Sequence, residues 1–152
     1  MNEDWACPER LRRMWDVLDP APVDLADRVL FALQLEDMEF ELLRMHGVLE
    51  SKGSRGHESA TTVTFTSDSL CVMVTLSEPR SGQRRLDGWL TPAAALRMEL
   101  RAPQGRQQTM ADLTGRFAFP ETPAGPIQLV VYPTEDTAVN LARSVITPAI
   151  QL

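Results

Sequence analysis

The sequence predicts an α+β protein in which an N-terminal helical hairpin or arm is followed by an antiparallel β-sandwich. Residues 1–50 place apolar side chains at helical spacing, whereas residues 60–152 contain short alternating stretches with turn residues about every 8–12 positions. Residues 51–59, SKGSRGHES, are small, polar and glycine-bearing, as in a linker. We therefore expect an acidic helical region over 1–50, a linker over 51–59 and a β-sandwich over 60–152.

Length and composition are those of a soluble globular protein. The chain has 152 residues, of which 43% are hydrophobic and 24% are charged. No apolar run approaches the roughly 20 residues that span a bilayer, and the acidic N-terminus lacks the apolar segment of a secretory signal. We expect a cytoplasmic protein that makes no membrane contact, with Cys7 and Cys71 both reduced.

Charge is concentrated in the N-terminal part. Residues 1–58 carry 13 acidic and seven basic side chains, and residues 59–152 carry eight of each, so the whole net charge of −6 lies before residue 59. Nucleic acid is disfavoured as a direct partner, because phosphate neutralisation needs a basic surface. A basic protein partner is compatible with this charge. Lys52 is the only lysine among 15 cationic residues, which indicates a GC-rich, actinobacterium-like source.

The first predicted helix covers Pro8 to Leu18. Proline suits the first helical position, and the prolines at 20 and 22 prevent the helix from continuing. Its apolar side chains recur at i, i+3, i+4 and i+7 and so share one face. They are Leu11, Met14, Trp15 and Leu18.

The second predicted helix runs from Leu25 to about His46. Asp24 is a candidate N-cap and Gly47 a candidate stop. Apolar residues at alternating spacings of four and three form one seam, as at a and d heptad positions: Phe31, Leu35, Met38, Leu42 and Met45. Beside the seam lies a cluster of acidic residues: Glu36, Asp37, Glu39 and Glu41.

The two helices carry more apolar surface than they can bury in each other. Burial of one large apolar side chain stabilises by about 1.5–3 kcal/mol, and an exposed apolar stripe of this width favours association. We expect the seam to pack on the β-region, on a second copy or on another protein.

The remaining chain alternates apolar and polar residues in short segments. The predicted strands are residues 61–66, 70–76, 84–90, 95–101, 106–111, 116–119, 127–131 and 139–147. Asp112 to Gly115 is predicted to form a tight turn. Gly88, inside a strand pattern, indicates a bulge or a close backbone approach.

This turn and its surroundings carry a family resemblance. The segment TMADLTGRF at 109–117, followed by Pro-Ala-Gly at 123–125 and the strand at 127–131, resembles the carboxypeptidase regulatory-like, transthyretin-like β-sandwich. The segment LDGWL at 86–90 is similar to the family's opening strand, with Trp89 in place of a small aliphatic residue. The resemblance covers about residues 83–152. It implies a non-enzymatic accessory domain.

A second resemblance concerns the helical region. The segments WDVLDP at 15–20 and DRVLFAL at 27–33 are similar to actinobacterial proteins that accompany alternative sigma factors, some of which are anti-sigma regulators. The zinc-type anti-sigma pattern, a His followed by Cys-x-x-Cys, is absent from the sequence. The resemblance thus implies a sigma-factor partner that is bound without metal.

The residue pattern contains no catalytic constellation. Nucleophilic catalysis needs a base beside a Ser or Cys, and the only histidines are His46, at the end of a predicted helix, and His57, in the predicted linker. The sequence lacks a nucleophile elbow, a glycine-rich phosphate loop and metal-ligand spacing. We expect no enzyme activity, no cofactor and no metal.

The sequence therefore favours a non-enzymatic protein-binding regulator, anti-sigma-like or sigma-associated. Its second helix would dock into a groove of the partner, with the apolar seam as anchor and the acidic cluster steering a basic surface. Two alternatives stay open. The sandwich could bind carbohydrate or another small ligand, with Trp89 as a platform, or the helices could only complete the fold or a homodimer.

Overall fold

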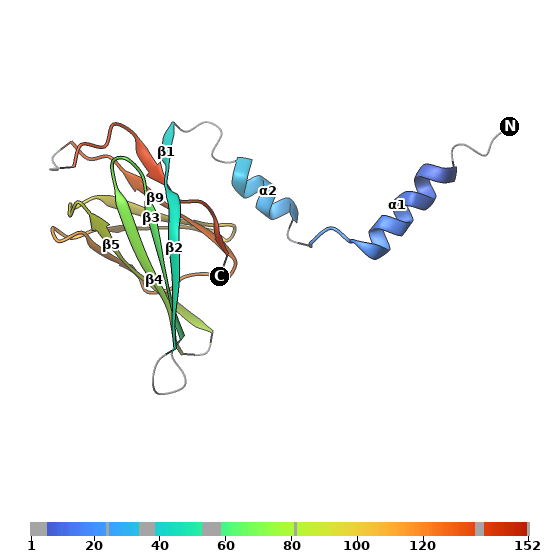
Figure 1. Cartoon of the computed structure of the whole chain (residues 1–152), viewed down its shortest axis with the longest axis horizontal. Helices are drawn as coiled ribbons and strands as arrows, with labels where there is room; N and C mark the ends of the chain where they lie inside the picture. Colours follow the sequence, from blue (N-terminus) through green and yellow to red (C-terminus); the bar gives the residue numbers. More distant parts are fainter. Residues whose placement is uncertain are drawn as a thin grey trace. The chain divides into compact units, whose positions relative to one another are not determined.

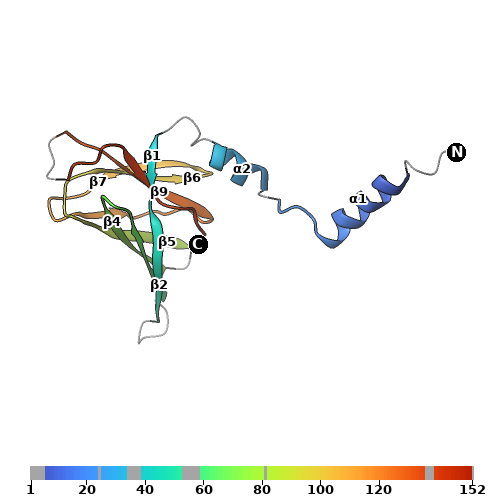
Figure 2. The same ribbon diagram turned by 45° about the horizontal axis from the view of Figure 1, so that its top comes forward.

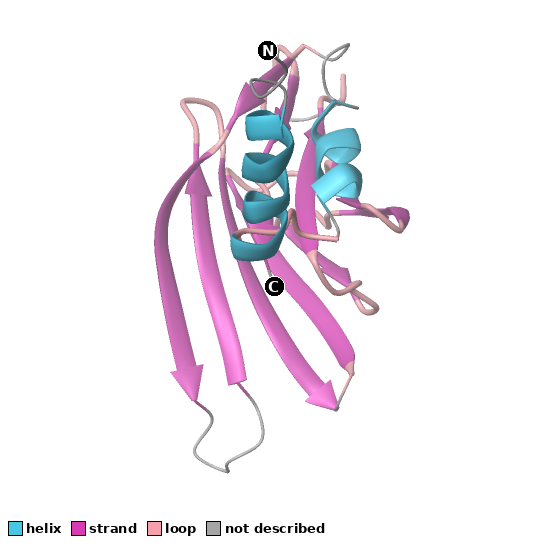
Figure 3. Ribbon diagram, turned by 90° about the vertical axis from the view of Figure 1, so that its right-hand side faces the viewer, coloured by secondary structure: helices cyan, strands magenta, loops and turns pink. Residues whose placement is uncertain are grey.

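The computed structural model describes residues 6–23, 25–33, 39–52, 59–80, 82–135 and 139–151. The chain divides into two compact units, residues 1–36 and 37–152. The described part of the first unit is helical, and that of the second unit is built from strands in two sheets (Figures 1 and 3). The protein is therefore β-rich.

The first unit contains α1, Ala6–Leu18, and α2, Leu25–Leu33. The first predicted helix is confirmed, including its end ahead of Pro20. The second predicted helix is confirmed only over its first nine residues. Phe31 in α2 is buried, whereas Leu25, Val29 and Leu30 are exposed.

The second unit contains eleven strands among its described residues. They are β1 Phe40–Leu42, β2 Arg44–Lys52, β3 Ser59–Thr66, β4 Cys71–Arg80, β5 Gln83–Thr91, β6 Arg97–Ala102, β7 Gly105–Met110, β8 Arg116–Phe119, β9 Pro126–Tyr132, β10 Ser144–Ile146 and β11 Ile150–Gln151. The strands predicted between residues 61 and 131 are all present, with ends shifted by a few residues. The last predicted strand is shorter than expected and is limited to β10.

The strands form two sheets. The β9 sheet has the order β1-β10-β9-β6-β7, and β11 also pairs with β9; the β4 sheet has the order β2-β3-β4-β5-β8. All strand pairs are antiparallel except β1 with β10, which is parallel. Figures 1 and 2 show the long strands of the β4 sheet running steeply across those of the other sheet.

Buried apolar side chains from both sheets form one continuous core. In the β4 sheet they are alternate residues, such as Val72 and Val74 of β4, because successive side chains of a strand point to opposite faces. In the β9 sheet Met98 and Leu129 occupy equivalent positions. The alternation read from the sequence thus identifies the core faces of these strands correctly.

The prediction of a helix from 25 to about 46 is wrong beyond the segment 34–38, which lies outside the described residues. Residues 40–42 form β1 and residues 44–52 form β2, which pairs along its length with β3. Strand pairing overrides the apolar spacing, and Gly47 and the β-branched Val48 are weak helix formers in any case. A register shift between Met45 and Gly47 places one extra residue in β2. Such a bulge interrupts the strict alternation of side chains along a strand, so the spacing of apolar residues can resemble that of a helix.

The predicted linker is also corrected. Ser51 and Lys52 end β2 and Ser59 begins β3, and these two strands pair with each other, so residues 53–58 connect a hairpin; their own conformation lies outside the described residues. The two compact units divide between Glu36 and Asp37 instead. A small, polar, glycine-bearing segment suits a hairpin connection as well as a linker between domains.

The predicted turn at Asp112 is confirmed and joins β7 to β8. Its amide group at Gly115 donates to the Asp112 carbonyl over 2.9 Å. The Asp112 Oδ1 accepts hydrogen bonds from the Thr114 amide, the Thr114 hydroxyl and the Arg116 amide at 2.8, 2.6 and 3.0 Å. Gly115 has φ +79°, and a Cβ there would lie 2.6 Å from the Leu90 carbonyl oxygen, so the position requires glycine.

Candidate functional site

The predicted partner-binding residues do not assemble into one helical seam among the described residues. Leu35, Glu36, Asp37 and Met38 lie outside those residues. Four of the other five lie on three different elements: Phe31 is buried in α2, Glu41 and Leu42 belong to β1, and Met45 belongs to β2. Glu39 is exposed ahead of β1. Helix-in-groove docking through this seam is therefore not available to Leu42 and Met45.

Glu41 has a structural contact rather than a free charge. Its Oε2 accepts a hydrogen bond from the Ser69 hydroxyl over 2.9 Å, and its Oε1 accepts a longer one from the Ser69 amide over 3.4 Å. Hydrogen bonding from Ser67, and then from Ser69, holds the pKa of the Glu41 carboxyl below its ordinary value. Glu41 thus ties the edge of the β9 sheet to the turn between β3 and β4.

The apolar stripe of α1 is exposed. Four side chains make up this stripe, with exposed fractions of 47% for Leu11, 44% for Met14, 58% for Trp15 and 70% for Leu18. At 3.6 residues per turn, the arginines at 10 and 12 border the stripe on its two sides. Val17, which is 79% exposed, lies off the stripe. The α1 stripe is an exposed apolar surface with a basic margin.

A second exposed surface lies on the outer face of the β4 sheet. Met73, Trp89 and Arg116 are cross-strand neighbours on β4, β5 and β8. The Trp89 side chain is 38% exposed, and the Arg116 guanidinium lies 5.2 Å from its ring centroid, in a cation–π contact. The sequence left open whether Trp89 is a core residue or an exposed platform; in the structure the ring is exposed, and Arg116 covers part of it.

A buried polar layer occupies the outer face of the β9 sheet. Glu99 is almost fully buried, and its Oε2 accepts a hydrogen bond from Gln108 over 2.9 Å. Arg97 lies 4.1 Å over the ring of Tyr132. Burial, followed by the charge of Glu99, raises the pKa of the Tyr132 hydroxyl, and burial, followed by the charge of Arg106, lowers the pKa of Arg101. Glu99 thus links β6 to Gln108 of β7 and to Tyr132 of β9.

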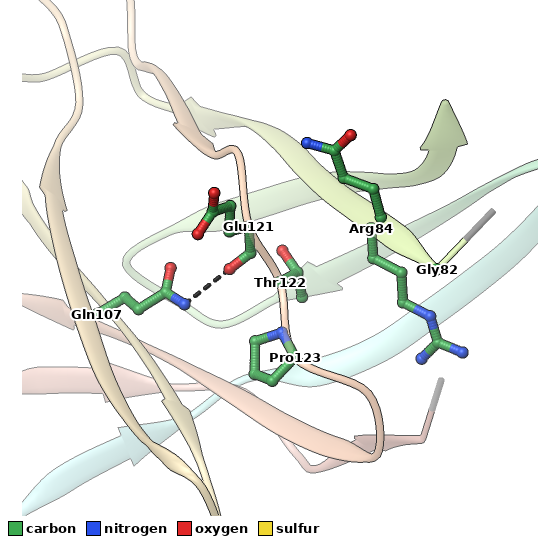
Figure 4. Close-up of a pocket in the computed structure, with 7 residues that line it drawn as sticks. Gly82, Arg84, Gln107, Glu121, Thr122 and Pro123 are labelled. Atoms are coloured by element: carbon green, nitrogen blue, oxygen red, sulfur yellow. Dashed lines mark hydrogen bonds between the residues drawn. The ribbon is translucent and has the colours of Figure 1, made fainter. Parts of the chain in front are cut away.

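The described part of the second unit contains a polar pocket of about 460 Å³. It lies where β5 begins, beside β7 and the loop between β8 and β9 (Figure 4). Its lining residues are Gly82, Gln83, Arg84, Gln107, Glu121, Thr122 and Pro123. The volume is within the range of about 300–1,000 Å³ usual for small-molecule sites. The pocket therefore has room for a small polar ligand.

Hydrogen bonds fix the loop that forms one wall of this pocket. The Thr122 amide donates to the Arg84 carbonyl over 2.9 Å, and the Gln107 side-chain amide donates to the Glu121 carbonyl over 2.7 Å (Figure 4). Just beyond the pocket, Gln104 donates to the Ala124 carbonyl over 3.0 Å. The wall is thus built by β5, β7 and the loop together, and needs little ordering when a ligand enters.

Among the lining residues that the structure describes, Arg84 carries the one cationic group. Its Nη1 is buried and has no hydrogen-bond partner in the described part of the chain. The neighbouring Arg85 instead forms a bidentate pair with Asp87, at 2.7 Å for both hydrogen bonds. Sequence reasoning missed this pocket because its residues come from three separate segments, and no spacing in the sequence relates position 84 to positions 107 and 121–123.

The described ranges also bear on metal binding and on membrane insertion. No group of three or more His, Cys, Asp or Glu side chains that could hold a metal ion occurs there. None of the helices is long and apolar enough to cross a bilayer. Cys71 is a free cysteine of intermediate exposure.

Comparison with known proteins gives no further assignment. No family model matches the chain, and neither the curated proteins nor the solved structures contain a significant match.

Proposed function

We propose that this chain is a non-enzymatic, cytoplasmic binding protein whose helix α1 docks into an apolar groove of a partner protein. The observation that carries this proposal is the exposure of the whole α1 stripe, Leu11, Met14, Trp15 and Leu18. Four apolar side chains on one helical face are the usual anchors of a helix that binds in a groove. Trp15 is the natural hot spot, because tryptophan is enriched among residues that dominate binding energy.

The partner's groove is expected to have an acidic margin. Arg10 and Arg12 border the α1 stripe, and charge complementarity at the rim of an interface sets orientation and association rate. The sequence alone favoured a basic partner attracted by the acidic cluster. We do not base the proposal on that cluster, because Glu41 is hydrogen-bonded to Ser69, and Glu36 and Asp37 lie outside the described residues. The resemblance of residues 15–20 and 27–33 suggests a sigma factor as partner and a regulatory outcome.

The second unit would serve as the folded scaffold of this protein. We infer that its two sheets form a β-sandwich of the carboxypeptidase regulatory-like, transthyretin-like kind. The shared apolar core of the two sheets and the turn centred on Asp112 support this inference. Such domains are accessories, in keeping with a chain whose activity is binding.

Two neighbouring positions on α1 provide a matched test. Leu18 lies in the stripe and Val17 lies off it, and both are exposed, at 70% and 79%. Affinity capture from the source cells, with the full chain as bait, is expected to recover a partner with wild type and with Val17→Glu, and to lose it with Leu18→Glu. Equal recovery by both variants, or recovery of the bait alone at physiological salt, would contradict the proposal.

Self-association is the alternative occupant of the α1 stripe. Sedimentation of the purified full chain separates the two cases. If wild type and Leu18→Glu are both monomers, the stripe does not bind a second copy and is available to another protein. If wild type is a dimer and Leu18→Glu is a monomer, the stripe is the dimer interface.

Carbohydrate binding on the outer face of the β4 sheet is a second candidate function. The exposed Trp89 ring beside Met73 favours it, because aromatic faces stack on sugars. A glycan array probed with wild type and with Trp89→Ala tests this candidate. Binding that disappears in the variant would support it, and an array without signal for wild type would remove it.

A further inference from the structure

We propose that the polar pocket beside Arg84 binds a small polar molecule through an oxyanion group, a carboxylate or a phosphate. The pocket lies within the second unit and is independent of the α1 stripe. Its volume of about 460 Å³ is ample for a molecule of the size of an amino acid or a monosaccharide phosphate.

The first step of the inference concerns the guanidinium of Arg84. Its Nη1 is buried and, within the described ranges, no protein acceptor satisfies it. A buried donor without an acceptor is destabilising in general. Because the protein holds Nη1 by no hydrogen bond, the guanidinium loses none when it turns toward an acceptor in the pocket. A carboxylate or phosphate presents two oxygens in the geometry that guanidinium prefers.

The second step concerns the charges around that group. The Arg85–Asp87 and Arg106–Glu99 ion pairs involve neither Arg84 nor Glu121. Figure 4 shows the Arg84 guanidinium well away from the Glu121 carboxylate, with Thr122 and Pro123 between them. Among the lining residues that the structure describes, no carboxylate forms an ion pair with Arg84. An anionic group suits the Arg84 end, and a neutral or cationic polar group suits the Glu121 end.

The third step concerns pre-organisation. The Arg84 carbonyl accepts a hydrogen bond from the Thr122 amide over 2.9 Å, so the main chain that carries the guanidinium is fixed to the loop that forms the opposite wall. The Gln107 side chain fixes the same loop at Glu121. A ligand therefore has to order little more than the Arg84 side chain, so the loss of conformational entropy on binding is small.

Titration followed by backbone amide chemical shifts tests this assignment on the full chain. Inorganic phosphate and acetate are the oxyanion probes, glucose 6-phosphate tests the added polar body, and glucose is the neutral control. We expect saturable shifts at Gly82, Gln107 and Thr122 with phosphate or acetate, tighter binding of glucose 6-phosphate than of phosphate, and no saturable shift with glucose. Shifts with glucose equal to those with glucose 6-phosphate would overturn the proposal.

Two arginine variants complete the test. Arg84→Gln keeps a polar side chain and is expected to weaken the response to phosphate at least about tenfold, since a hydrogen bond to a charged group is involved. Arg143→Gln removes the same charge from an exposed position away from the pocket and should change it less than about twofold. Equal weakening by both variants would show general charge attraction and contradict the site. If Arg84→Gln does not fold, the wild-type titration still tests the proposal. Chemical-shift changes that centre on residues outside the pocket would contradict it.

Discussion

Gly88 in β5 makes room for the ring of Phe117 on the neighbouring strand β8. The two residues are paired across the strands, and a Cβ at position 88 would overlap the Phe117 ring atoms. Phe117 is itself buried in the core, with its ring 6.2 Å from that of Phe119 in an edge-to-face arrangement. The ring therefore has little room to retreat, and glycine is the residue that lets β8 close onto β5.

Gly88→Ala is expected to destabilise the protein by about 1–3 kcal/mol, because the added methyl group overpacks a filled core. Gly47→Ala is the matched control, since a Cβ at that strand position meets nothing within 4 Å. Urea unfolding of both variants measures the difference. Equal midpoints for the two variants would mean that the Phe117 ring does not rest on Gly88.

Asp112 gives a pH-dependent contribution at the same scale. Hydrogen bonds from Thr114 and then from Arg116 lower the pKa of its carboxyl group. A depressed pKa in the folded state means that the contribution is fully present above the unfolded value of about 3.9 and is lost as pH falls through the lower folded value. The Asp112→Ala variant should therefore be less stable than wild type at pH 7, with a gap that narrows below about pH 4.

Thermal unfolding of the two proteins between pH 7 and pH 3 measures that gap. Each protein serves as the other's reference for the remaining carboxyl groups, so only the difference between the two midpoints is interpreted. A gap that stays constant over the whole range would show that the charge of Asp112 is irrelevant to the turn.

At the scale of elements, the passage from β1 to β2 carries the chain from one sheet to the other. β1 pairs with β10 in the β9 sheet and β2 pairs with β3 in the β4 sheet. Leu43 lies between them, is fully buried in the core, and donates its amide to the Ile146 carbonyl over 2.8 Å. Its neighbour Leu42 is 57% exposed. One step along the chain thus separates a core residue from a surface residue.

The Leu43→Ala variant should lose about 2–5 kcal/mol, as expected for a core leucine replaced by alanine. Leu42→Ala should stay within about 0.5 kcal/mol of wild type, since exposed substitutions rarely do more. Chemical denaturation of both variants provides the comparison. Similar losses at the two positions would fit residues 40–46 in a helix with a wide apolar stripe better than in two strands.

Some elements of the fold could be predicted from the sequence, and others, such as β1 and β2, could not. The strands from 61 to 131 alternate so regularly that Val72 and Val74, for instance, could be assigned to the core without coordinates. The Asp112 turn could also be predicted, because its hydrogen bonds are local: the Asp112 carboxylate accepts them from the amides two and four residues ahead. β1 and β2 could not be found this way, because partners at 144–146 and 59–66 decide their conformation. The pocket could not be predicted from the sequence for the same reason, since Arg84, Gln107 and Thr122 come together only in the folded chain.

At the scale of the whole molecule, the chain consists of two compact units that divide between Glu36 and Asp37. All core-cluster residues belong to the second unit. Residues 9–23, which include most of α1, are exposed throughout. The stability of the fold should therefore be largely independent of α1, in keeping with the binding role proposed for this helix.

Deletion of residues 1–23 tests that independence. The shortened chain should unfold in one cooperative transition, with a free energy of unfolding within about 1 kcal/mol of the full chain, because the described side chains of the deleted segment, residues 9–23, are exposed. Circular dichroism with urea provides the measurement. A large loss of stability would show that α1 completes the fold and would favour the purely structural role for the helices.

The central claim is that α1 presents its apolar stripe to another macromolecule, and amide hydrogen exchange of the full chain, alone and with the captured partner, tests it most directly. A 13-residue helix with an exposed stripe is marginally stable by itself. The amides of residues 9–18 should therefore exchange rapidly in the free protein and become strongly protected in the complex, while those of β4 and β6 change little. Equal protection of α1 with and without the partner would contradict the claim.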